Sequence, residues 1–269
     1  MIVRILRTAL FYALFLGQTV VLAIVVGVSA LIWKRTPFGW AVAQYWGRSN
    51  LFLLRWIAGI RTKVSGAENI PAGACIIAAK HMSDWDIFAI LPYTVRPAFI
   101  AKRELMDIPL FGHAARTFDT ISIDRKKGAE AIPAMMEEAR AAVAKGCRIV
   151  IFPEGTRKAP LDEPDYRQGI VRMYLELGVP VVPVAVSSGL YWGRNSLVLW
   201  PGTARAEFLP PILPGLSGED FRAQLVGTIE GVTDRLIAEA IDEGLAGPVP
   251  QEWRDTLAAR QQAAAARAP

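Results

Sequence analysis

Residues 129–152, AEAIPAMMEEARAAVAKGCRIVIF, place a helix pattern directly before a strand pattern, and this order decides the fold class. Ala129–Lys145 is rich in Ala, Met and Glu, which favour helix, and Gly146 follows at a position where helices commonly need a left-handed residue. Arg148–Phe152 is a short apolar run with β-branched and aromatic residues, as expected of a buried strand. The stretch therefore predicts a helix packed against a sheet.

The same alternation extends to both sides of this stretch. Further strands are predicted at Cys75–Ala79, Pro97–Ala101, Thr120–Ile123 and Val179–Ser187, and further helices at Gly169–Leu177 and from Gly218 to Ile241. The prolines in Val179–Ser187 favour an edge strand or a strand end, because proline cannot donate to the ladder. Strands that alternate with helices predict an α/β fold with a mixed, largely parallel central sheet flanked by helices.

The N-terminal segment has the composition of a membrane element. No charged residue occurs from Thr8 to Trp33, and basic residues stand on both sides of this run: Arg4, Arg7, Lys34 and Arg35. A helix over the run would be roughly 39 Å long at ~1.5 Å per residue, enough to cross a ~30 Å hydrocarbon core with tilt. The run far exceeds the ~7–15 apolar residues of a signal peptide, so we expect it to be retained. Spanning the bilayer and dipping into one leaflet both remain open.

A second helical stretch is predicted from Phe38 to about Ile60, after Pro37 breaks the first helix. It is rich in tryptophan and other aromatic residues, and Gln44, Arg48 and Arg55 fall along one narrow stripe. Aromatic and basic residues on one helix are typical of an element that lies near lipid headgroups. The alternative is a helix that packs in the core of the following domain.

Composition agrees with a lipid-associated protein of one main domain. The 269 residues are 52% hydrophobic and 20% charged, the mean hydropathy is +0.29, and the net charge of +5 suits an acidic surface, either nucleic acid or acidic lipid. Cys75 and Cys147 lie in apolar runs, which predicts buried free thiols, and the sequence has no zinc-binding pattern. We expect anchoring helices at residues 1–62, an α/β domain at 63–250 and an Ala-rich tail, a loose helix at most, at 251–269.

Lys80-His81-Met82-Ser83-Asp84-Trp85-Asp86 follows a predicted strand and precedes an apolar stretch. Ser83 is suited to cap a helix and Asp86 to return a bond to the backbone, so one interpretation is a helix start with an incidental histidine. His81 and Asp86 would lie about 140° apart on a regular helix, so they can meet only if His81 lies on the preceding loop and folds back. A carboxylate would then hold one imidazole nitrogen and leave the other as a base, with Asp84 as the rival partner.

Phe152-Pro153-Glu154-Gly155-Thr156-Arg157 comes directly after the strand of the opening stretch. Gly155, between Glu154 and Thr156, lets main-chain N–H groups approach an anion, and the planar guanidinium of Arg157 suits phosphate. The alternative is an ordinary turn with a surface arginine.

Two basic segments lie between these motifs. Arg125–Lys127 gives three consecutive cations after a predicted strand, and Lys102-Arg103-Glu104-Leu105 follows another. Such segments can hold a phosphate, but a solvated charge run is the usual explanation, and each segment alone is weak evidence.

Together the motifs resemble the lysophosphatidic acid acyltransferases, the 1-acyl-glycerol-3-phosphate acyltransferases of the glycerolipid acyltransferase superfamily. The HxxxxD box of that superfamily is matched from His81 to Asp86, and the FPEGTR box is complete from Phe152 to Arg157. The first box alone is weakly specific, but the second box about seventy residues later makes the match strong.

Three weaker blocks extend the resemblance over about residues 63–215. They are Lys102–Leu105 running to Pro109 and Gly112, Ser122–Arg125, and the proline-marked hydrophobic block Val179–Val184. The chain departs from the family at Asp119-Thr120, where members often carry a glycine, and this puts the local backbone in doubt.

The resemblance implies transfer of a fatty acyl group from acyl-CoA or acyl carrier protein to the free sn-2 hydroxyl of 1-acyl-glycerol-3-phosphate, giving phosphatidic acid. It implies no metal, no further cofactor and no covalent acyl-enzyme. His81 would be the general base and Asp86 its orienting partner. The substrate-binding candidates are Lys102, Arg125, Glu154, Gly155, Thr156 and Arg157. The enzyme would work on membrane lipid at the cytoplasmic face of the inner or cell membrane.

Other functions stay open at this point. The motifs hardly separate this acceptor from glycerol-3-phosphate or from another lyso-lipid such as lyso-ornithine lipid. A non-catalytic membrane lipid-binding protein would use the basic loops and apolar helices, but it has no need for His81 and Asp86 in register. A nucleic-acid binder should cluster basic and aromatic residues outside the lipid-like segment, whereas most tryptophans here lie in or near it. We therefore expect no nucleic-acid partner.

Overall fold

The computed structural model describes residues 1–33, 36–109 and 111–267. Its centre is a 7-stranded sheet with the order β1-β7-β6-β2-β5-β3-β4. The strands are β1 (Ile60–Ser65), β2 (Cys75–Ala79), β3 (Pro97–Lys102), β4 (Ile121–Ile123), β5 (Arg148–Ile151), β6 (Val181–Val186) and β7 (Gly202–Phe208). Within the described chain β6 and β7 pair antiparallel, and the other neighbouring strands pair parallel. The predicted mixed, largely parallel α/β sheet is confirmed.

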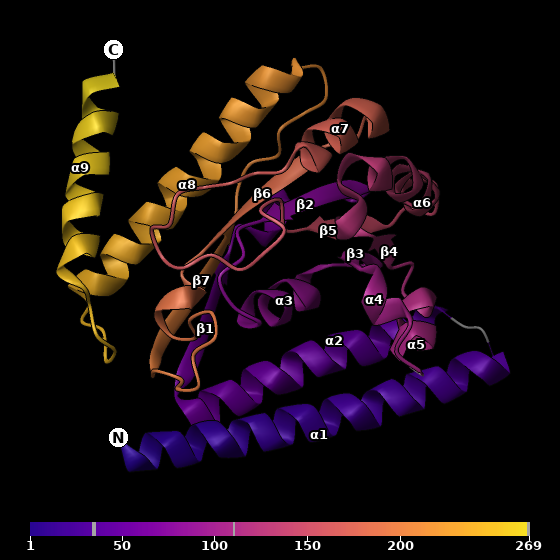
Figure 1. The fold of residues 1–269 in the computed structure, drawn as a ribbon, viewed down its shortest axis with the longest axis horizontal. Coiled ribbons are helices and arrows are strands. Elements are labelled where there is room, and N and C mark those ends of the chain that lie inside the picture. Colours follow the sequence, from indigo (N-terminus) through magenta and orange to yellow (C-terminus); the bar gives the residue numbers. More distant parts are fainter. Residues whose placement is uncertain (34–35, 110, 268–269) are drawn as a thin grey trace.

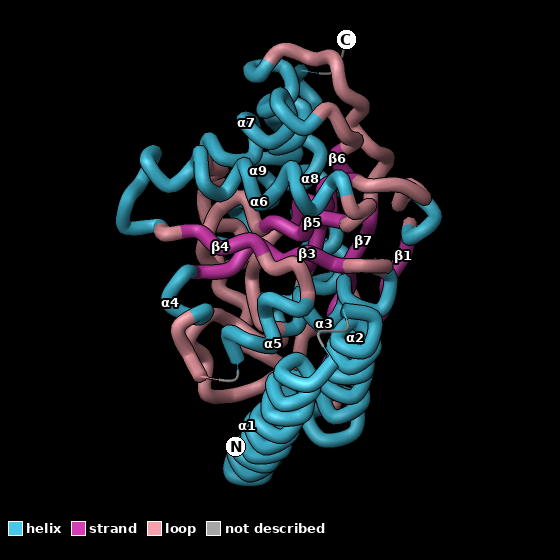
Figure 2. Tube along the Cα trace, turned by 90° about the vertical axis from the view of Figure 1, so that its right-hand side faces the viewer, coloured by secondary structure: helices cyan, strands magenta, loops and turns pink. Residues whose placement is uncertain are grey.

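Helices cover both faces of the sheet (Figure 1, Figure 2). One face carries α1 (Ile2–Trp33), α2 (Thr36–Leu53) with the π-helical turn η1 (Leu54–Ala58), α3 (Trp85–Ile90) and α5 (Phe111–Thr117). The other face carries α6 (Ile132–Ala144), α7 (Gln168–Leu177) and α8 (Gly218–Asp242). The remaining helical elements are α4 (Arg103–Met106), α9 (Gln251–Arg267), η2 (Ala67–Asn69), η3 (Leu91–Tyr93), η4 (Arg125–Ala131) and η5 (Ser188–Leu190).

The central strands are hydrophobic without a break because both of their faces are buried. In β2, Ile76 and Ala78 belong to the core under α6, α7 and α8, whereas Ile77 and Ala79 belong to the core on the side of α1 and α3. Successive side chains of a strand point to opposite faces, so an uninterrupted apolar run supplies both cores. Both cysteines are buried and free, as predicted.

The helix of the opening stretch is α6, and it begins later than predicted. Gly128, with φ 54° and ψ −126°, interrupts the helical backbone, and Pro133 lies in the first turn of α6, where its missing N–H costs little. The end is as predicted: Gly146 has φ 75°, its N–H donates to Val143 O, and the next N–H, of Cys147, donates to Ala142 O. These two bonds form a Schellman cap.

The position of β6 corrects one prediction. The edge interpretation of Val179–Ser187 is wrong, because β6 lies between β2 and β7. The carbonyl of Pro183 accepts a hydrogen bond from Leu209 N at 2.9 Å, so the nitrogen of Pro183 faces the same side, where regular pairing with β7 has ended at Phe208. Proline therefore removes no bond between β6 and β2.

Two strands were not anticipated, and they pair with each other. β1 and β7 run parallel from Ile60↔Gly202 to Ser65↔Glu207. The expected boundary at residue 62/63 thus falls inside β1. The tail is an ordered helix, α9, whose Leu257 is buried against the core.

The first helix packs along the domain and also presents an apolar outer face. Phe11 is fully buried against Trp192, with ring centroids 5.4 Å apart, and Gln18 donates to Asn50 of α2 at 2.6 Å. On the outer face large apolar side chains are exposed: Leu6, Leu10, Leu14, Val20, Val21 and Val25. By length and composition, Ile2–Ser29 could cross a membrane.

Candidate active site

Four neighbouring parallel strands each lead into a motif singled out in the sequence. His81 follows β2, Phe152 follows β5, Lys102 ends β3, and Arg125 comes soon after β4. The sheet order β2-β5-β3-β4 places these strand ends in a row. Ligands of α/β sheets bind at the carboxyl ends of parallel strands, so the row defines the candidate site.

His81 and Asp86 meet in the way that their spacing requires. His81 lies on the loop before α3, which begins at Trp85, and its Nδ1 is 2.9 Å from Asp86 Oδ2. The same oxygen accepts the N–H groups of Met82 at 2.7 Å and Ser83 at 2.9 Å, while Ser83 Oγ accepts the N–H of Trp85 at 3.1 Å. The loop that leads into α3 and the His–Asp pair are therefore one hydrogen-bonded structure, and the N–H groups of the loop fix the carboxylate that holds the imidazole.

Ser188 completes the surroundings of Asp86 and was missed in the sequence. It lies in η5, just after β6, is 1% exposed, and donates its hydroxyl to Asp86 Oδ1. Asp86 is fully buried, and its two oxygens receive four hydrogen-bond donors in all. Burying a carboxylate is costly unless its oxygens are hydrogen-bonded, and these donors meet that need. The only signal in the sequence was a serine just after a predicted strand. Because Ser188 and Asp86 are 102 residues apart, the sequence pattern did not connect them.

The imidazole of His81 is clamped but still reachable. Its ring stacks on Phe152 with centroids 4.0 Å apart and planes 21° apart, and its side chain is 15% exposed. A carboxylate at Nδ1 favours the tautomer with the proton on Nδ1 and a lone pair on Nε2. This arrangement can act as a general base towards a group that approaches Nε2.

Asp84 pairs with Arg157 rather than with His81. Arg157 Nη1 is 3.0 Å from Asp84 Oδ2, and both side chains are about one-third exposed. Burial raises the pKa of Asp84, while the positive charge of Arg157 opposes that rise. The ion pair brings the FPEGTR segment against the HxxxxD loop, and a second bond, from Lys158 N to His81 O at 2.8 Å, ties the same two segments.

Glu154 points into the protein interior. Its carboxylate is 3.0 Å from Lys80 Nζ, which also contacts Glu230 of α8 at 2.8 Å, and Tyr166 donates its hydroxyl to Glu230 at 2.8 Å. Burial raises the pKa of Glu154, and the ammonium of Lys80 opposes that rise. Lys80 and Glu154 are each 1% exposed, so this cluster joins β2, the FPEGTR turn and α8 beneath the candidate site.

The remaining predicted residues lie near the strand ends. Gly155, with φ 68°, turns the chain after Phe152, whose carbonyl accepts the N–H of Gly155, and Thr156 is exposed beside it. Lys102 is exposed and pairs in register with Ile123 of β4. Arg125 begins η4; its side chain lies outside the described part of the chain. Among the described residues no group of three or more His, Cys, Asp or Glu is placed to hold a metal ion.

The first helix reaches the candidate site through Tyr12. The hydroxyl of Tyr12 accepts a hydrogen bond from Trp192 Nε1 at 3.0 Å, and it lies within electrostatic range of Asp84 and Arg157. The N-terminal segment is thus structurally joined to the site, which the sequence patterns did not indicate.

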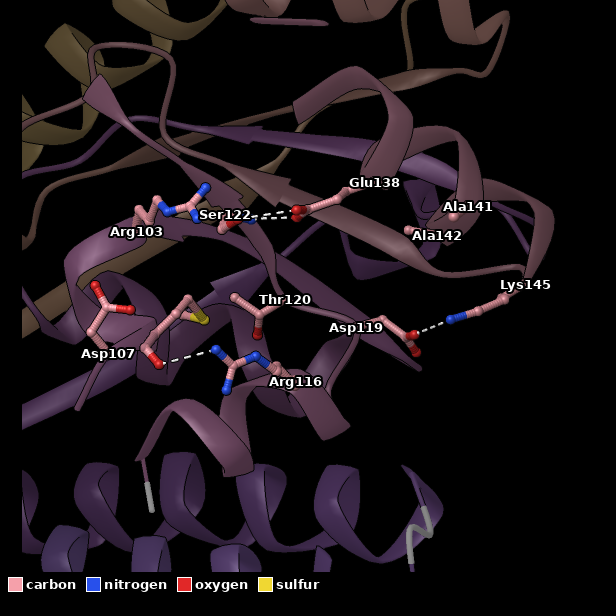
Figure 3. A pocket seen from close by; sticks show the side chains of 11 residues that line it. Arg103, Asp107, Arg116, Asp119, Thr120, Ser122, Glu138, Ala141, Ala142 and Lys145 are labelled. Carbon is pink, nitrogen blue, oxygen red and sulfur yellow. Dashed lines mark hydrogen bonds and ion pairs between the residues drawn. The ribbon is translucent and has the colours of Figure 1, made fainter. Parts of the chain in front are cut away.

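A separate hollow of about 430 Å³ lies between α4, α5, β4 and α6 (Figure 3). Its lining has three cations, Arg103, Arg116 and Lys145, and three acids, Asp107, Asp119 and Glu138, and of these Lys145 pairs with Asp119. The hollow contains none of the predicted site residues, and its balanced charges give no preference for an anion.

Comparison with known sequences agrees with this geometry. The family described as Acyltransferase matches residues 61–187, which include both the HxxxxD and the FPEGTR segments. The chain thus contains an acyltransferase domain.

Full-length relatives define the family more closely. The chain is 30% identical over 261 residues to a 1-acyl-sn-glycerol-3-phosphate acyltransferase from Pseudomonas aeruginosa, covering 92% of this chain and 97% of that one. It is 30% identical to the alpha form from Mus musculus, covering 74% of this chain and 72% of that one. This chain belongs to the 1-acyl-sn-glycerol-3-phosphate acyltransferase family.

The fold has a counterpart of known structure. The 1-acyl-sn-glycerophosphate (LPA) acyltransferase PlsC from Thermotoga maritima superposes with a TM-score of 0.72 at 22% sequence identity. The match covers 87% of this chain and 97% of that chain, so it includes more than the central domain.

Proposed function

We propose that this chain transfers a fatty acyl group from a thioester donor to the sn-2 hydroxyl of 1-acyl-sn-glycerol-3-phosphate and so makes phosphatidic acid. The observation that carries the proposal is His81, held at Nδ1 by a fully buried Asp86, in a chain whose full-length relatives are named for this acceptor. The donor is acyl-CoA or acyl carrier protein, because both present the acyl group as a thioester.

The chemistry needs one base and a fixed acceptor. Nε2 of His81 takes the proton of the acceptor hydroxyl as the oxygen attacks the thioester carbonyl. The tetrahedral intermediate collapses with cleavage of the C–S bond, and the imidazolium returns the proton to the thiolate. The thioester is already activated, so orientation of the two substrates supplies much of the remaining rate enhancement.

Arg157, Arg125 and Lys102 would bind the acceptor phosphate. Arg157 lies on the FPEGTR segment next to the His81 loop, and the other two follow adjacent strands. Asp84 holds Arg157 in place in the absence of phosphate, and a phosphate would compete for the same guanidinium. Glu154 would act indirectly, because its ion pair with Lys80 holds the FPEGTR turn in place.

The enzyme would work at the membrane surface, with α1 and α2 as its anchor. The inner side of α1 contacts the domain at several points along its length, from Thr8, which accepts the N–H of Leu199, to Phe15, whose ring centroid lies 5.7 Å from that of Phe88. A helix that crossed the bilayer apart from the domain would lose these contacts, so α1 would lie along one leaflet. Because acyl-CoA and acyl carrier protein are intracellular, that leaflet would be the cytoplasmic one.

One assay tests the proposal. Purified full-length protein in detergent is given a labelled acyl thioester with lysophosphatidic acid, glycerol-3-phosphate or lyso-ornithine lipid, and His81→Ala serves as the control. We expect label in phosphatidic acid with the first acceptor and none with His81→Ala. If another acceptor is labelled in preference, that acceptor is the substrate in place of lysophosphatidic acid. If none of the acceptors is labelled, a non-catalytic lipid-binding protein is favoured.

A further inference from the structure

The loop that follows Arg157 is held from outside the central domain. This loop, residues 158–167, leaves the FPEGTR turn and returns to α7. Backbone bonds fix its two ends: Lys158 N donates to His81 O at 2.8 Å, and Arg167 N donates to Pro153 O at 2.9 Å. The middle of the loop is held by Arg260 of α9, whose Nη2 donates to Leu161 O at 2.9 Å.

Arg260 joins three segments with one guanidinium. Its Nη1 is 3.1 Å from Asp234 Oδ1 of α8, and its Nη2 also contacts Glu163 at 3.2 Å. Arg260 and Asp234 are 24% and 17% exposed, so their bond is partly shielded from water, whereas Glu163 is 92% exposed and adds little. Burial raises the pKa of Asp234, and the charge of Arg260 opposes that rise. The planar fork of arginine allows this branching, whereas an ammonium group is a point charge.

The contact of Arg260 with Leu161 O, which we call the clamp, falls on a residue with a constrained backbone. Leu161 has φ 64°, in the left-handed region that residues with a β-carbon rarely adopt. Such a conformation persists where the surroundings determine it. Leu161 stands in a turn closed by a hydrogen bond from Asp162 N to Ala159 O at 3.2 Å, its side chain packs against the core, and its carbonyl accepts from Arg260.

The tail helix is itself anchored, so it presents Arg260 firmly. Leu257 is 6% exposed within the core cluster, and Trp253 packs against the same cluster. Both residues, like Asp234, lie beyond the segment 61–187 that matches the acyltransferase family.

We infer that Arg260 is a positioning residue for the acceptor site: α9 holds the loop that follows Arg157 and thereby keeps Arg157 in place against the segment His81–Asp86. The inference rests on the proposed function. Only a short segment separates Leu161 from Arg157, and Lys158 within it is bonded to His81 O. A shift at Leu161 is therefore passed to the phosphate-binding arginine more than to the acyl donor. Arg260→Ala should weaken acceptor binding without removing the base.

The test compares variants of the full-length protein in steady-state kinetics. Arg260→Ala should raise the KM for lysophosphatidic acid about tenfold, as expected for loss of a charge-assisted hydrogen bond, and change the donor KM less than twofold. Arg260→Lys, which keeps the charge but lacks the fork, should fall between Arg260→Ala and wild type. Arg254→Ala, an exposed arginine on the same helix, is the matched control and should behave as wild type. Equal changes in both KM values would mean general destabilisation and overturn the inference.

Two further measurements separate this inference from the proposed function. Trypsin should cleave after Lys158 faster in native Arg260→Ala than in wild type or Arg254→Ala, whichever lipid is the substrate. Unchanged cleavage would overturn the clamp even if the chain makes phosphatidic acid. Asp234→Asn keeps Arg260 but loosens it, so it should produce a smaller rise in acceptor KM. The double variant should be no worse than Arg260→Ala, because Asp234 acts through Arg260.

Discussion

Asp86 does two tasks with one carboxylate. Its Oδ2 accepts the N–H groups of Met82 and Ser83 in the loop before α3, and the same atom holds Nδ1 of His81. Because the backbone of this loop holds the carboxylate, the position of the base is fixed by the local fold rather than by a flexible side chain. Asp84, two residues earlier, faces Arg157 instead. The two acids therefore should respond differently to substitution.

The first prediction separates these roles. His81→Ala should lower the acyl-transfer rate by about 10²–10⁴, the usual contribution of a general base. Asp86→Asn should be nearly as severe, and Asp84→Asn milder. Ser188→Ala removes one of the four donors to Asp86 and should lower the rate by roughly tenfold, in line with a hydrogen bond to a charged group.

Initial rates at saturating donor measure these effects, with circular dichroism and vesicle binding as controls for folding. A His81→Ala protein that keeps most of its activity would contradict the mechanism. A reversed order of Asp84→Asn and Asp86→Asn would make Asp84 the orienting residue, against the observed geometry.

The second prediction concerns the acceptor phosphate. Arg157→Ala should raise the KM for lysophosphatidic acid tenfold or more, since hydrogen bonds to charged groups contribute ~1.5–3 kcal/mol. Arg157→Lys should restore only part of the loss, because lysine lacks the planar fork. The donor KM, measured in the same assay, should change little. Unchanged acceptor kinetics in both variants would remove Arg157 from the phosphate site.

At the scale of single residues, the sequence was sufficient to predict contacts between residues that are close together along the chain. The spacing of His81 and Asp86 allowed one geometry for contact, and the structure has it. Ser188 and Lys80 could not be assigned in this way, because their partners Asp86 and Glu230 lie 102 and 150 residues away along the chain. Long-range pairs depend on strand order, and single-sequence patterns do not determine strand order.

At the scale of elements, strands with one regular apolar run were predicted and mixed strands were not. β2 and β5 are buried on both faces, so their runs are conspicuous. β7 alternates small buried residues, Ala204 and Ala206, with Arg205 and Glu207, and alanine is a weak strand signal. The internal position of β6 was missed because the tolerance for Pro183 depends on where β7 stops pairing.

The third prediction belongs to the joint between β2, the FPEGTR turn and α8. Lys80→Met leaves the buried Glu154 and the partly buried Glu230 without their cation, which should lower the free energy of unfolding by about 3–5 kcal/mol. Lys63→Met, an exposed lysine of β1, is the control and should change it by less than about 0.5 kcal/mol. Denaturant titration of both variants measures the difference.

The direction in which this loss of stability changes with pH follows from the raised pKa of Glu154. Burial raises the pKa of Glu154 above its unfolded value, so its contribution to stability is most favourable at low pH and declines as pH rises through the folded pKa. Without the ammonium of Lys80, which opposes the rise, the decline should steepen. The deficit of Lys80→Met should therefore grow as the pH rises above the unfolded pKa of a glutamate, ~4.3. A deficit that stays constant as the pH rises would show that Glu154 does not titrate with the fold.

At the scale of the whole molecule, the site and the apolar face belong to one body. α1 and α2 lie together under the domain (Figure 1), and Tyr12 of α1 bonds to Trp192 close to Asp84 and Arg157. A lipid acceptor keeps its acyl chain in the bilayer, and each CH₂ drawn into water costs ~0.8 kcal/mol. An enzyme that rests on the leaflet needs to raise only the headgroup end.

The last prediction tests this placement without removing α1, since deletion would expose the partners of Phe11. Leu14→Glu with Val21→Glu places two charges on the outer face, where these side chains are 43% and 58% exposed. Burial of each apolar side chain in lipid stabilises by about 1.5–3 kcal/mol, so binding to vesicles should fall by on the order of 100-fold or more. Activity should fall on vesicle-borne acceptor and persist on a monomeric short-chain acceptor. Leu175→Glu, 56% exposed on α7 across the sheet, is the control, and flotation of both proteins with vesicles is the measurement. Equal flotation of the two would show that the outer face of α1 does not meet the membrane.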